Sequence, residues 1–246
     1  MSAATGAIRG AALPNEREIY RWFTIALAAV VFVGFARSFF LRPLFPERPV
    51  PPEGFFSLHG AAFAAWFALL VVQASLVTSG RVALHRSVGV AGAVLAALMV
   101  VLGSVGALIA AGRPGGFIGL PIPGPVFLAL PLIEMAMFAV LIAIAIAKRS
   151  DPAIHKRLMI IASASLTAAA FARWPVIGNF GPPAFFAASD LFLIAVAIWD
   201  FRSRGRLHPA TWITGGLVIA SQPLQLMVGS TAGWLSFARW AVGLVH

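Results

Sequence analysis

The sequence predicts an all-α, polytopic membrane helix bundle with seven transmembrane helices and a short C-terminal interfacial helix. Hydrophobic residues make up 60% of the 246 positions and charged residues only 11%, a composition that a soluble domain of this length could not expose to water. The apolar residues also form runs of about 20, the length that a helix needs to cross the hydrocarbon core. Short segments rich in proline, glycine and charge separate these runs, as expected for loops between membrane spans.

Seven apolar runs are long enough, or nearly long enough, to be spans, and each is bounded by proline, glycine or charged residues. They cover residues 20–41, 55–78, 83–111, 126–147, 153–174, 183–201 and 209–228. The chain therefore divides into an N-terminal segment (1–19), a transmembrane domain (20–228) and a C-terminal segment (229–246).

Both terminal segments differ from the spans. Residues 231–245 are apolar but carry Arg239 between Trp234 and Trp240, which favours a helix lying in the membrane interface over an eighth span. Residues 1–13 are small and polar with one arginine and no apolar core. We therefore expect no cleavable signal peptide, and a first span that is retained as its own insertion signal.

The distribution of lysine and arginine over alternate loops predicts the orientation. One side receives twelve basic residues: Arg9, Arg17, Arg21, Arg81, Arg86, Lys148, Arg149, Lys156, Arg157, Arg202, Arg204 and Arg206. The other side receives six: Arg37, Arg42, Arg48, Arg113, Arg173 and Arg239. Because basic loops stay in the cytoplasm, we expect the N-terminus in the cytoplasm and the C-terminus outside.

Composition and motifs exclude several functions. The net charge of +10 occurs as short basic clusters between apolar runs, without the interleaved aromatic residues of a single-strand binder, so no nucleic-acid partner is expected. The chain has no cysteine, which excludes disulfides, iron–sulfur clusters and thiolate metal sites. Walker, GxSxG and HExxH motifs are absent, as is a lysine inside a span. Any cofactor must be held by His, carboxylate, Met or amide groups, and enzymatic activity stays undecided.

Three histidines are predicted at one depth on the cytoplasmic side. His85, His155 and His208 open the third, fifth and seventh spans. Three imidazoles at one depth could bind a divalent metal, and two could clamp the iron of a b-type haem. Histidines beside basic residues at a membrane interface also serve as amphipathic anchors. All three roles are compatible with the sequence.

A second polar cluster is predicted in the outer half of the membrane. At about 1.5 Å per residue, Arg37, Glu134, Asp190 and Arg173 lie roughly 24, 21, 15 and 24 Å from the inner boundary. Gln222 and Gln225 reach a similar depth, and His59 begins the second span at the outer interface. An ionised group facing lipid near the midplane costs at least about 2.5 kcal/mol, so these side chains should face the bundle interior and pair.

Such a cluster has two readings. It could hold helices together without a ligand, with the arginines reaching outward and the carboxyls protonated or bonded to neighbouring helices. Alternatively, it could form an outward-facing pocket that binds a polar ligand, relays protons or holds the propionates of a haem. In the haem case His59 would be the axial ligand.

The runs 59–89 (HGAAFAAWFALLVVQASLVTSGRVALHRSVG) and 155–173 (HKRLMIIASASLTAAAFAR) resemble a family of bacterial multi-pass membrane proteins of unknown function. The family pattern is a His opening one span, a His-Arg pair opening the next, and later a His-basic pair whose span closes on an arginine. The matching positions are His59, His85 with Arg86, His155 with Lys156, and Arg173. The resemblance implies a bacterial cytoplasmic (inner) membrane protein and no established activity.

The leading expectation is an inner-membrane bundle that binds a redox cofactor, a b-type haem or a divalent metal, or another small ligand. The expected cofactor-binding residues are His59, His85, His155, Arg37 and Arg173. One alternative is a non-enzymatic accessory or structural subunit of a larger membrane complex, and another is a small-molecule carrier. The lipid bilayer is the expected environment, while complex partners and oligomeric state stay open.

Overall fold

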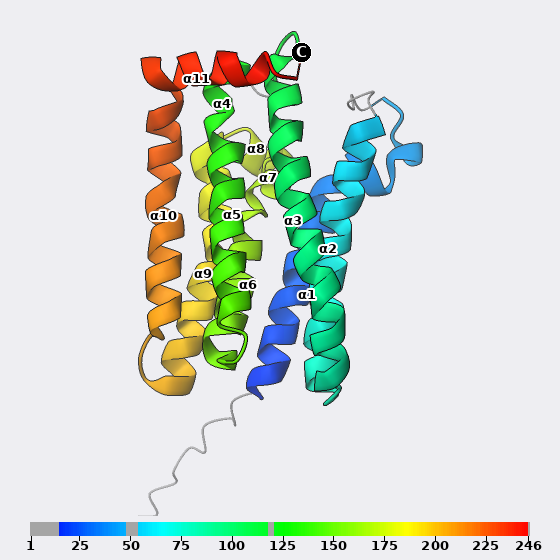
Figure 1. Ribbon diagram of the computed structural model, residues 1–246, viewed down its shortest axis with the longest axis vertical. Coiled ribbons are helices and arrows are strands. Elements are labelled where there is room, and N and C mark those ends of the chain that lie inside the picture. Colours follow the sequence, from blue (N-terminus) through cyan, green and yellow to red (C-terminus); the bar gives the residue numbers. More distant parts are fainter. Residues whose placement is uncertain (1–14, 48–53, 118–120, 246) are drawn as a thin grey trace, which may run out of the picture.

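The computed structural model describes residues 15–47, 54–117 and 121–245. Every regular element among them is helical, so the predicted all-α class is confirmed (Figure 1). The elements in order are α1 (Glu16–Phe35), η1 (Ala36–Phe40), η2 (Arg42–Leu44), α2 (Gly54–Thr78), α3 (Val82–Gly112), α4 (Gly124–Phe127), α5 (Ala129–Ala147), α6 (Pro152–Ser165), α7 (Ala168–Phe171), α8 (Pro175–Gly178), α9 (Pro182–Arg204), α10 (Pro209–Gly229) and α11 (Ala232–Val242).

The long helices run side by side along one axis, and their connections alternate between two ends of the bundle (Figure 1). The end that holds the start of α1 and the α2–α3, α5–α6 and α9–α10 connections is called the basic end here. The opposite end, crossed by α11, is called the α11 end. The larger predicted group of basic residues lies at the basic end and the smaller at the α11 end, while Arg9 and Arg48 lie outside the described residues.

Five helical segments of the described residues are long and apolar enough to cross a membrane. They are Glu16–Phe40, Gly54–Thr78, Val82–Gly112, Gly124–Ala147 and Pro182–Arg204. Val90, Val94 and Leu98 of α3 are exposed at helical spacing, as expected for a stripe that faces lipid tails. These features indicate a membrane protein.

The other two predicted spans differ from this group. The seventh is α10, a single helix from Pro209 to Gly229. Its two glutamines and internal Pro223 make it less apolar than the five segments above. The fifth predicted span, residues 153–174, is not one helix.

The break in the fifth span lies inside the bundle. Asp151 caps the start of α6 by accepting from the backbone N–H of Ala153 (2.9 Å) and Ile154 (3.2 Å), which is a favourable N-cap arrangement. α6 then ends at Ser165. The Ser165 hydroxyl donates to the Ala162 carbonyl (2.9 Å) and that of Thr167 to the Ala164 carbonyl (2.6 Å). The chain continues as the short helices α7 and α8.

A close approach of α1 fixes the segment beyond the break. A Cβ placed on Gly34 would lie 2.6 Å from the Ala170 carbonyl oxygen and 2.7 Å from the Ala170 Cα. These are backbone contacts, so the two segments touch only because position 34 has no side chain. Gly34 therefore sets the position of α7 against α1.

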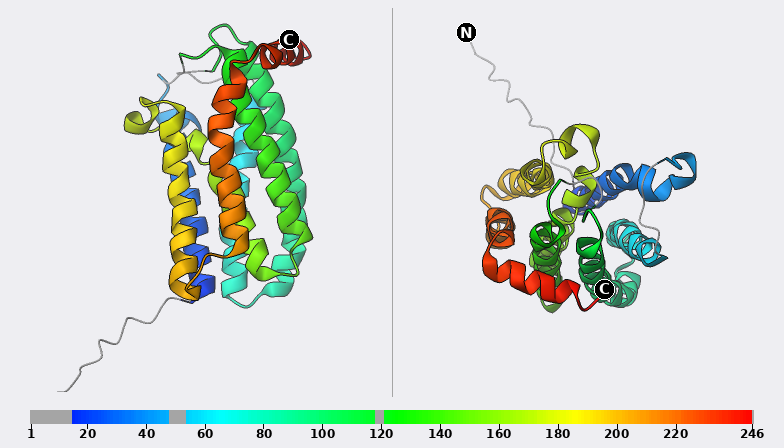
Figure 2. Two further views of the ribbon diagram at one scale, coloured as in Figure 1. Left: turned by 90° about the vertical axis from the view of Figure 1, so that its left-hand side faces the viewer. Right: turned by 90° about the horizontal axis from the view of Figure 1, so that it is seen from above.

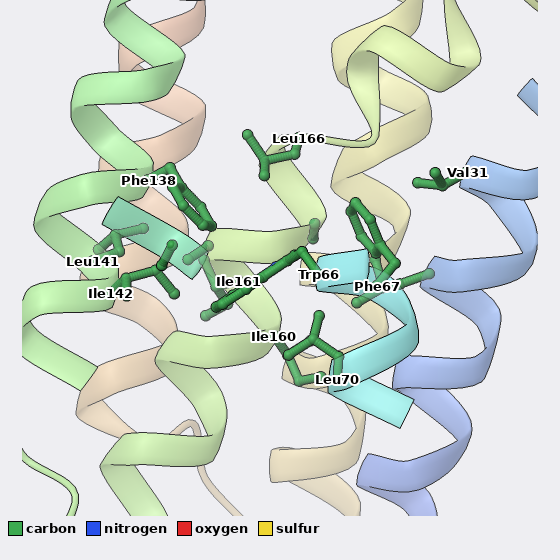
Figure 3. Packing of buried hydrophobic residues seen from close by; sticks show 14 of the residues in the cluster. Val31, Trp66, Phe67, Leu70, Phe138, Leu141, Ile142, Ile160, Ile161 and Leu166 are labelled. Carbon is green, nitrogen blue, oxygen red and sulfur yellow. The ribbon is translucent and has the colours of Figure 1, made fainter. Parts of the chain in front are cut away.

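The main apolar core fills the middle of the bundle (Figure 3). It joins α1, α2, α5 and α6 through Val31, Trp66, Phe67, Leu70, Phe138, Leu141, Ile142, Ile160 and Ile161. The indole N–H of Trp66 also donates to the Ser163 hydroxyl (3.1 Å), so the polar atom of this buried ring is satisfied. This core holds α6, eight of whose 14 residues are buried, inside the bundle.

The last helix lies across the α11 end, roughly perpendicular to the long helices (Figures 1 and 2). Thr231 caps it by accepting from the Trp234 N–H (3.3 Å). The Trp234 indole donates to the carbonyl of Pro125 (2.9 Å), the second residue of α4. The 11-residue α11 thus bridges from α10 to α3 and α4 instead of running parallel to them.

Candidate functional site

A small polar cavity lies where α6 stops. It is lined by Glu134, Met137, Ser165, Phe186, Ser189, Val218, Ser221, Gln222 and Gln225, from α5, α6, α9 and α10. The enclosed space is about the size of one water molecule. Three residues of the predicted outer cluster, Glu134, Gln222 and Gln225, therefore meet in one place, beside the end of a broken helix.

Two of the three serine hydroxyls in the cavity wall donate their hydrogens to backbone carbonyls. The hydroxyls of Ser165 and Ser221 donate to the carbonyls of Ala162 (2.9 Å) and Val218 (2.7 Å), so their oxygens keep only lone pairs. Because the Ser221 hydrogen is committed, this oxygen must accept from the Gln225 side-chain nitrogen (3.2 Å).

In this orientation the side-chain oxygen of Gln225 accepts no hydrogen bond from the described residues. Gln225 is 2% exposed, and its Oε1 atom has no hydrogen-bond partner among the described residues. An unsatisfied buried polar atom costs about 1–3 kcal/mol unless something else satisfies it. This oxygen therefore marks the cavity as a place for a donor or a cation.

The second predicted carboxylate lies beside this group. Asp190 accepts from the Gln222 side-chain nitrogen at 2.8 Å, which links α9 to α10. The expected partners of Glu134 and Asp190 were Arg37 and Arg173, but the ion pairs of the described residues include no such pair. Asp190 instead uses a neutral amide.

Both of those arginines lie on the outside of the bundle. Arg37 and Arg173 are exposed. The Arg173 guanidinium donates to the Ala169 carbonyl (2.5 Å) and lies 4.1 Å from the centre of the Phe35 ring, while Arg37 lies 5.3 Å from that of Phe45. Arginines at this level of a membrane helix reach out along apolar surface toward water. Although Arg37 and Arg173 were predicted at a depth similar to that of Glu134 and Asp190, they do not pair with these carboxylates.

A buried ion pair lies at the basic end and was not predicted from the sequence. Arg157 and Asp200 are both 0% exposed, and the Arg157 guanidinium donates to both Asp200 oxygens. The Thr211 hydroxyl and the His208 backbone N–H (3.1 Å) also donate to Asp200. Arg157 was counted among the basic residues of the cytoplasmic loops, but with Asp200 it joins α6, α9 and α10 within the protein.

A second layer of charge extends this pair toward α1. Glu16 accepts from Lys156 at 2.6 Å and lies 3.7 Å from Arg157. The Lys156 ammonium is 4.8 Å from the centre of the Tyr20 ring, a cation–π distance. The first turns of α1 and α6 are thus tied together at the basic end.

Two of the three predicted metal-binding histidines meet. The rings of His85 on α3 and His155 on α6 lie edge to face with centres 6.4 Å apart. His155 Nδ1 donates to the Ala145 carbonyl (2.8 Å), so its Nε2 keeps a lone pair. The Gln73 amide satisfies both of its neighbours in one orientation only, in which its nitrogen donates to His85 Nδ1 (2.6 Å) and its oxygen accepts from the Gly89 N–H (2.9 Å).

His208 has a different hydrogen-bonding role from His85 and His155. Its Nδ1 accepts from the Ala210 backbone N–H (3.1 Å) and so caps α10. Partial burial lowers the pKa of His208, and the nearby positive charges of Arg157 and Arg204 lower it further. The neutral ring that the cap requires is therefore favoured.

His59 is packed against α3 near the α11 end. Its Nδ1 contacts the Leu102 carbonyl (3.3 Å), and its ring stacks on Phe63 with centres 4.4 Å apart. α2 separates it from His85, since His59 is in the first turns of that helix and His85 follows its far end. Among the described residues, no three His, Asp or Glu side chains form a group that could hold a metal ion.

Comparison of the chain with protein-family models, curated proteins and solved structures finds no match. Proposals about function therefore depend on the geometry described above.

Proposed function

We propose that this chain is a seven-span protein of the bacterial inner membrane, N-terminus in the cytoplasm, that carries a small polar solute through the cavity at the break of the fifth span. In this arrangement the basic end faces the cytoplasm, as the positive-inside rule requires, and α11 lies in the outer interface. The broken α6–α7 segment is the fifth of the seven spans, and α10 is the seventh.

The observation that carries this proposal is the end of α6 at Ser165 beside a cavity lined by Glu134 and Gln225. Non-helical backbone inside a membrane bundle is tolerated where it lines a polar site. Membrane carriers place their binding sites at such interrupted helices, because the helix end offers polar groups near the bilayer midplane. A bundle held together only by packing would need neither the break nor the carboxyl.

Accessibility of the cavity tests the proposal. The chain contains no cysteine, so Ser189→Cys introduces a single thiol into the cavity wall. Since a carrier must open its site to one side of the membrane, we expect this thiol to react with a small membrane-impermeant methanethiosulfonate added to oriented vesicles. The measurement is the labelled fraction against time, with reagent on each side in turn.

Two matched variants serve as the negative and the positive control for the labelling of Ser189→Cys. Ser163→Cys places a thiol at a position that is also buried but bonded to Trp66 in the core, and it should stay unlabelled in intact membranes. Ser230→Cys at the exposed turn before α11 should label at once. If Ser189→Cys is as inert as Ser163→Cys from both sides, the cavity is closed and the carrier proposal fails.

A second candidate function follows from the His85–His155 contact: binding of a metal ion or redox cofactor at the basic end. His155 Nε2 has a free lone pair, and His85 could offer that of Nδ1 if the Gln73 amide moved away from it. Rings in edge-to-face contact favour a shared metal ion over a haem, whose plane would have to lie between them.

Elemental analysis and the absorption spectrum of detergent-purified protein test this candidate. We expect stoichiometric divalent metal that is lost in both His85→Ala and His155→Ala, because each removes a ligand. His208→Ala, which removes only the α10 cap, should retain the metal. A Soret band would assign haem, and a colourless, metal-free preparation would exclude the site.

A further inference from the structure

We infer that the cavity at the end of α6 binds one monovalent cation, with the Glu134 carboxylate, the Gln225 side-chain oxygen and the serine hydroxyl oxygens as its ligands. This inference rests on the proposed function, because it names the solute of the same site. Four features of the cavity favour a cation: the oxygen atoms in its walls, its single carboxyl, its size and the helix end beside it.

The walls select a donor or a cation. The hydrogens of Ser165 and Ser221 are bonded to backbone carbonyls, and Gln225 Oε1 is buried without a protein partner among the described residues. Oxygen atoms of carboxylates, amides and hydroxyls are the ligands that hard cations prefer. These oxygen atoms favour a cation over an anion.

The charge of the site selects a monovalent ion. Glu134 is the one carboxyl that lines the cavity, and no Lys, Arg or His of the described residues lines it. In a medium of low dielectric constant a lone ionised carboxylate is costly, and so is any excess positive charge. One proton or one monovalent cation makes the site neutral, whereas a divalent ion would leave it positive.

Size and helix direction agree with this assignment. The space fits one water-sized group, which a dehydrated alkali-metal ion matches and an organic solute exceeds. The C-terminal end of α6 adjoins the cavity through Ser165. The C-terminus of a helix carries partial negative charge and stabilises a cation.

Binding is an exchange with a proton. In the empty state Glu134 is a neutral carboxylic acid. When the cation M⁺ enters, the carboxyl releases its proton to water: Glu134–COOH + M⁺ gives Glu134–COO⁻·M⁺ + H⁺. Atoms and charge balance, and the site remains neutral throughout.

Other titratable groups around Glu134 are few and lie elsewhere. α5 contains no other charged residue, and α4 and α10 contain none. The charged and titratable residues of α3 and α6 are His85, Arg86, His155, Lys156 and Arg157, in the first turns at the basic end. Asp190 of α9 touches the cavity only through Gln222.

The test is cation-dependent stability of the full chain in detergent. Thermal midpoints are compared in NaCl, LiCl, KCl and N-methyl-D-glucamine chloride at equal ionic strength. We expect at least one alkali-metal ion to raise the midpoint in a saturable way, because a ligand that binds only the folded state stabilises it. Since one proton leaves per cation, the apparent affinity should increase about tenfold per pH unit while Glu134 is protonated in the empty site.

Variants and a direct measurement complete the test. Glu134→Gln should abolish both the cation effect and its pH dependence, and Gln225→Met should weaken cation affinity but keep the pH dependence. Glu18→Gln, the same chemical change at the basic end, should behave like the parent. For the parent itself, adding the stabilising salt to weakly buffered protein should release protons, read by a pH-sensitive dye, so the result does not depend on any variant folding.

The outcomes separate the two proposals. Equal stability in all four salts and no proton release would overturn the cation site, while labelling of Ser189→Cys from one side would leave the carrier proposal standing. An inert Ser189→Cys with cation-dependent stability would leave a cation-binding site and remove transport.

Discussion

Arg157→Met is expected to lower the free energy of unfolding by about 3–5 kcal/mol, the cost of breaking a buried ion pair from one side. The substitution keeps an unbranched apolar stem but leaves Asp200 ionised, fully buried and without its cation. Thermal midpoints in detergent and unfolding by sodium dodecyl sulfate measure the loss.

The double variant Arg157→Met/Asp200→Asn identifies the cause. The asparagine oxygen can still accept from Thr211 and from the His208 N–H, and no buried charge remains. We expect it to regain roughly half or more of the loss, since removing both charges is far less costly than removing one. Arg202→Met, at an exposed position of the same end, should melt like the parent. If Arg157→Met does so too, the pair contributes nothing to stability.

Gly34→Leu is the second substitution with a large expected effect. Its side chain would enter a contact in which a Cβ alone lies 2.6–2.7 Å from Ala170 backbone atoms, so α1 and α7 must separate. Overpacking of this kind costs about 1–3 kcal/mol and occasionally more. Because α7 follows the break at Ser165, we also expect the labelling rate of Ser189→Cys to change in this background.

Gly216→Leu is the matched control for that experiment. It is also a glycine in a long helix, but a Cβ there meets nothing within 4 Å. Replacing it should leave the labelling rate of Ser189→Cys unchanged and stabilise the helix by up to about 1 kcal/mol. Equal melting of Gly34→Leu and Gly216→Leu would show that α1 and α7 are not held at contact distance.

Hydropathy predicted the helices well because their length and composition follow directly from the thickness of the bilayer. The predicted spans 55–78, 83–111 and 183–201 differ from α2, α3 and α9 by no more than three residues at either end. Residues 153–174 were predicted as one helix, since nothing in their hydropathy records that α6 ends at Ser165. A count of apolar residues does not show where a helix is interrupted inside a bundle.

Depth arithmetic predicted part of the site. It placed Glu134, Gln222 and Gln225 at a similar depth, and these three side chains line one cavity. It failed for Arg37 and Arg173, since depth says nothing about which face of a helix a residue occupies. For Arg157, which was not predicted to be buried, helical spacing could have given this information. It lies on the same helix face as Ile160, Ile161 and Ala164, and all of them are buried.

α11 has a mechanical consequence for the bundle. One of its ends follows α10 directly, and its Trp234 donates a hydrogen bond to the carbonyl of Pro125 in α4. Tilting α10 away from α5 at this end would require that bond to break or the turn at Ser230 and Thr231 to unwind. The helix thus restrains α10 at one end of the bundle, and the hydrogen bonds of Thr211 and His208 to the buried Asp200 restrain it at the other end.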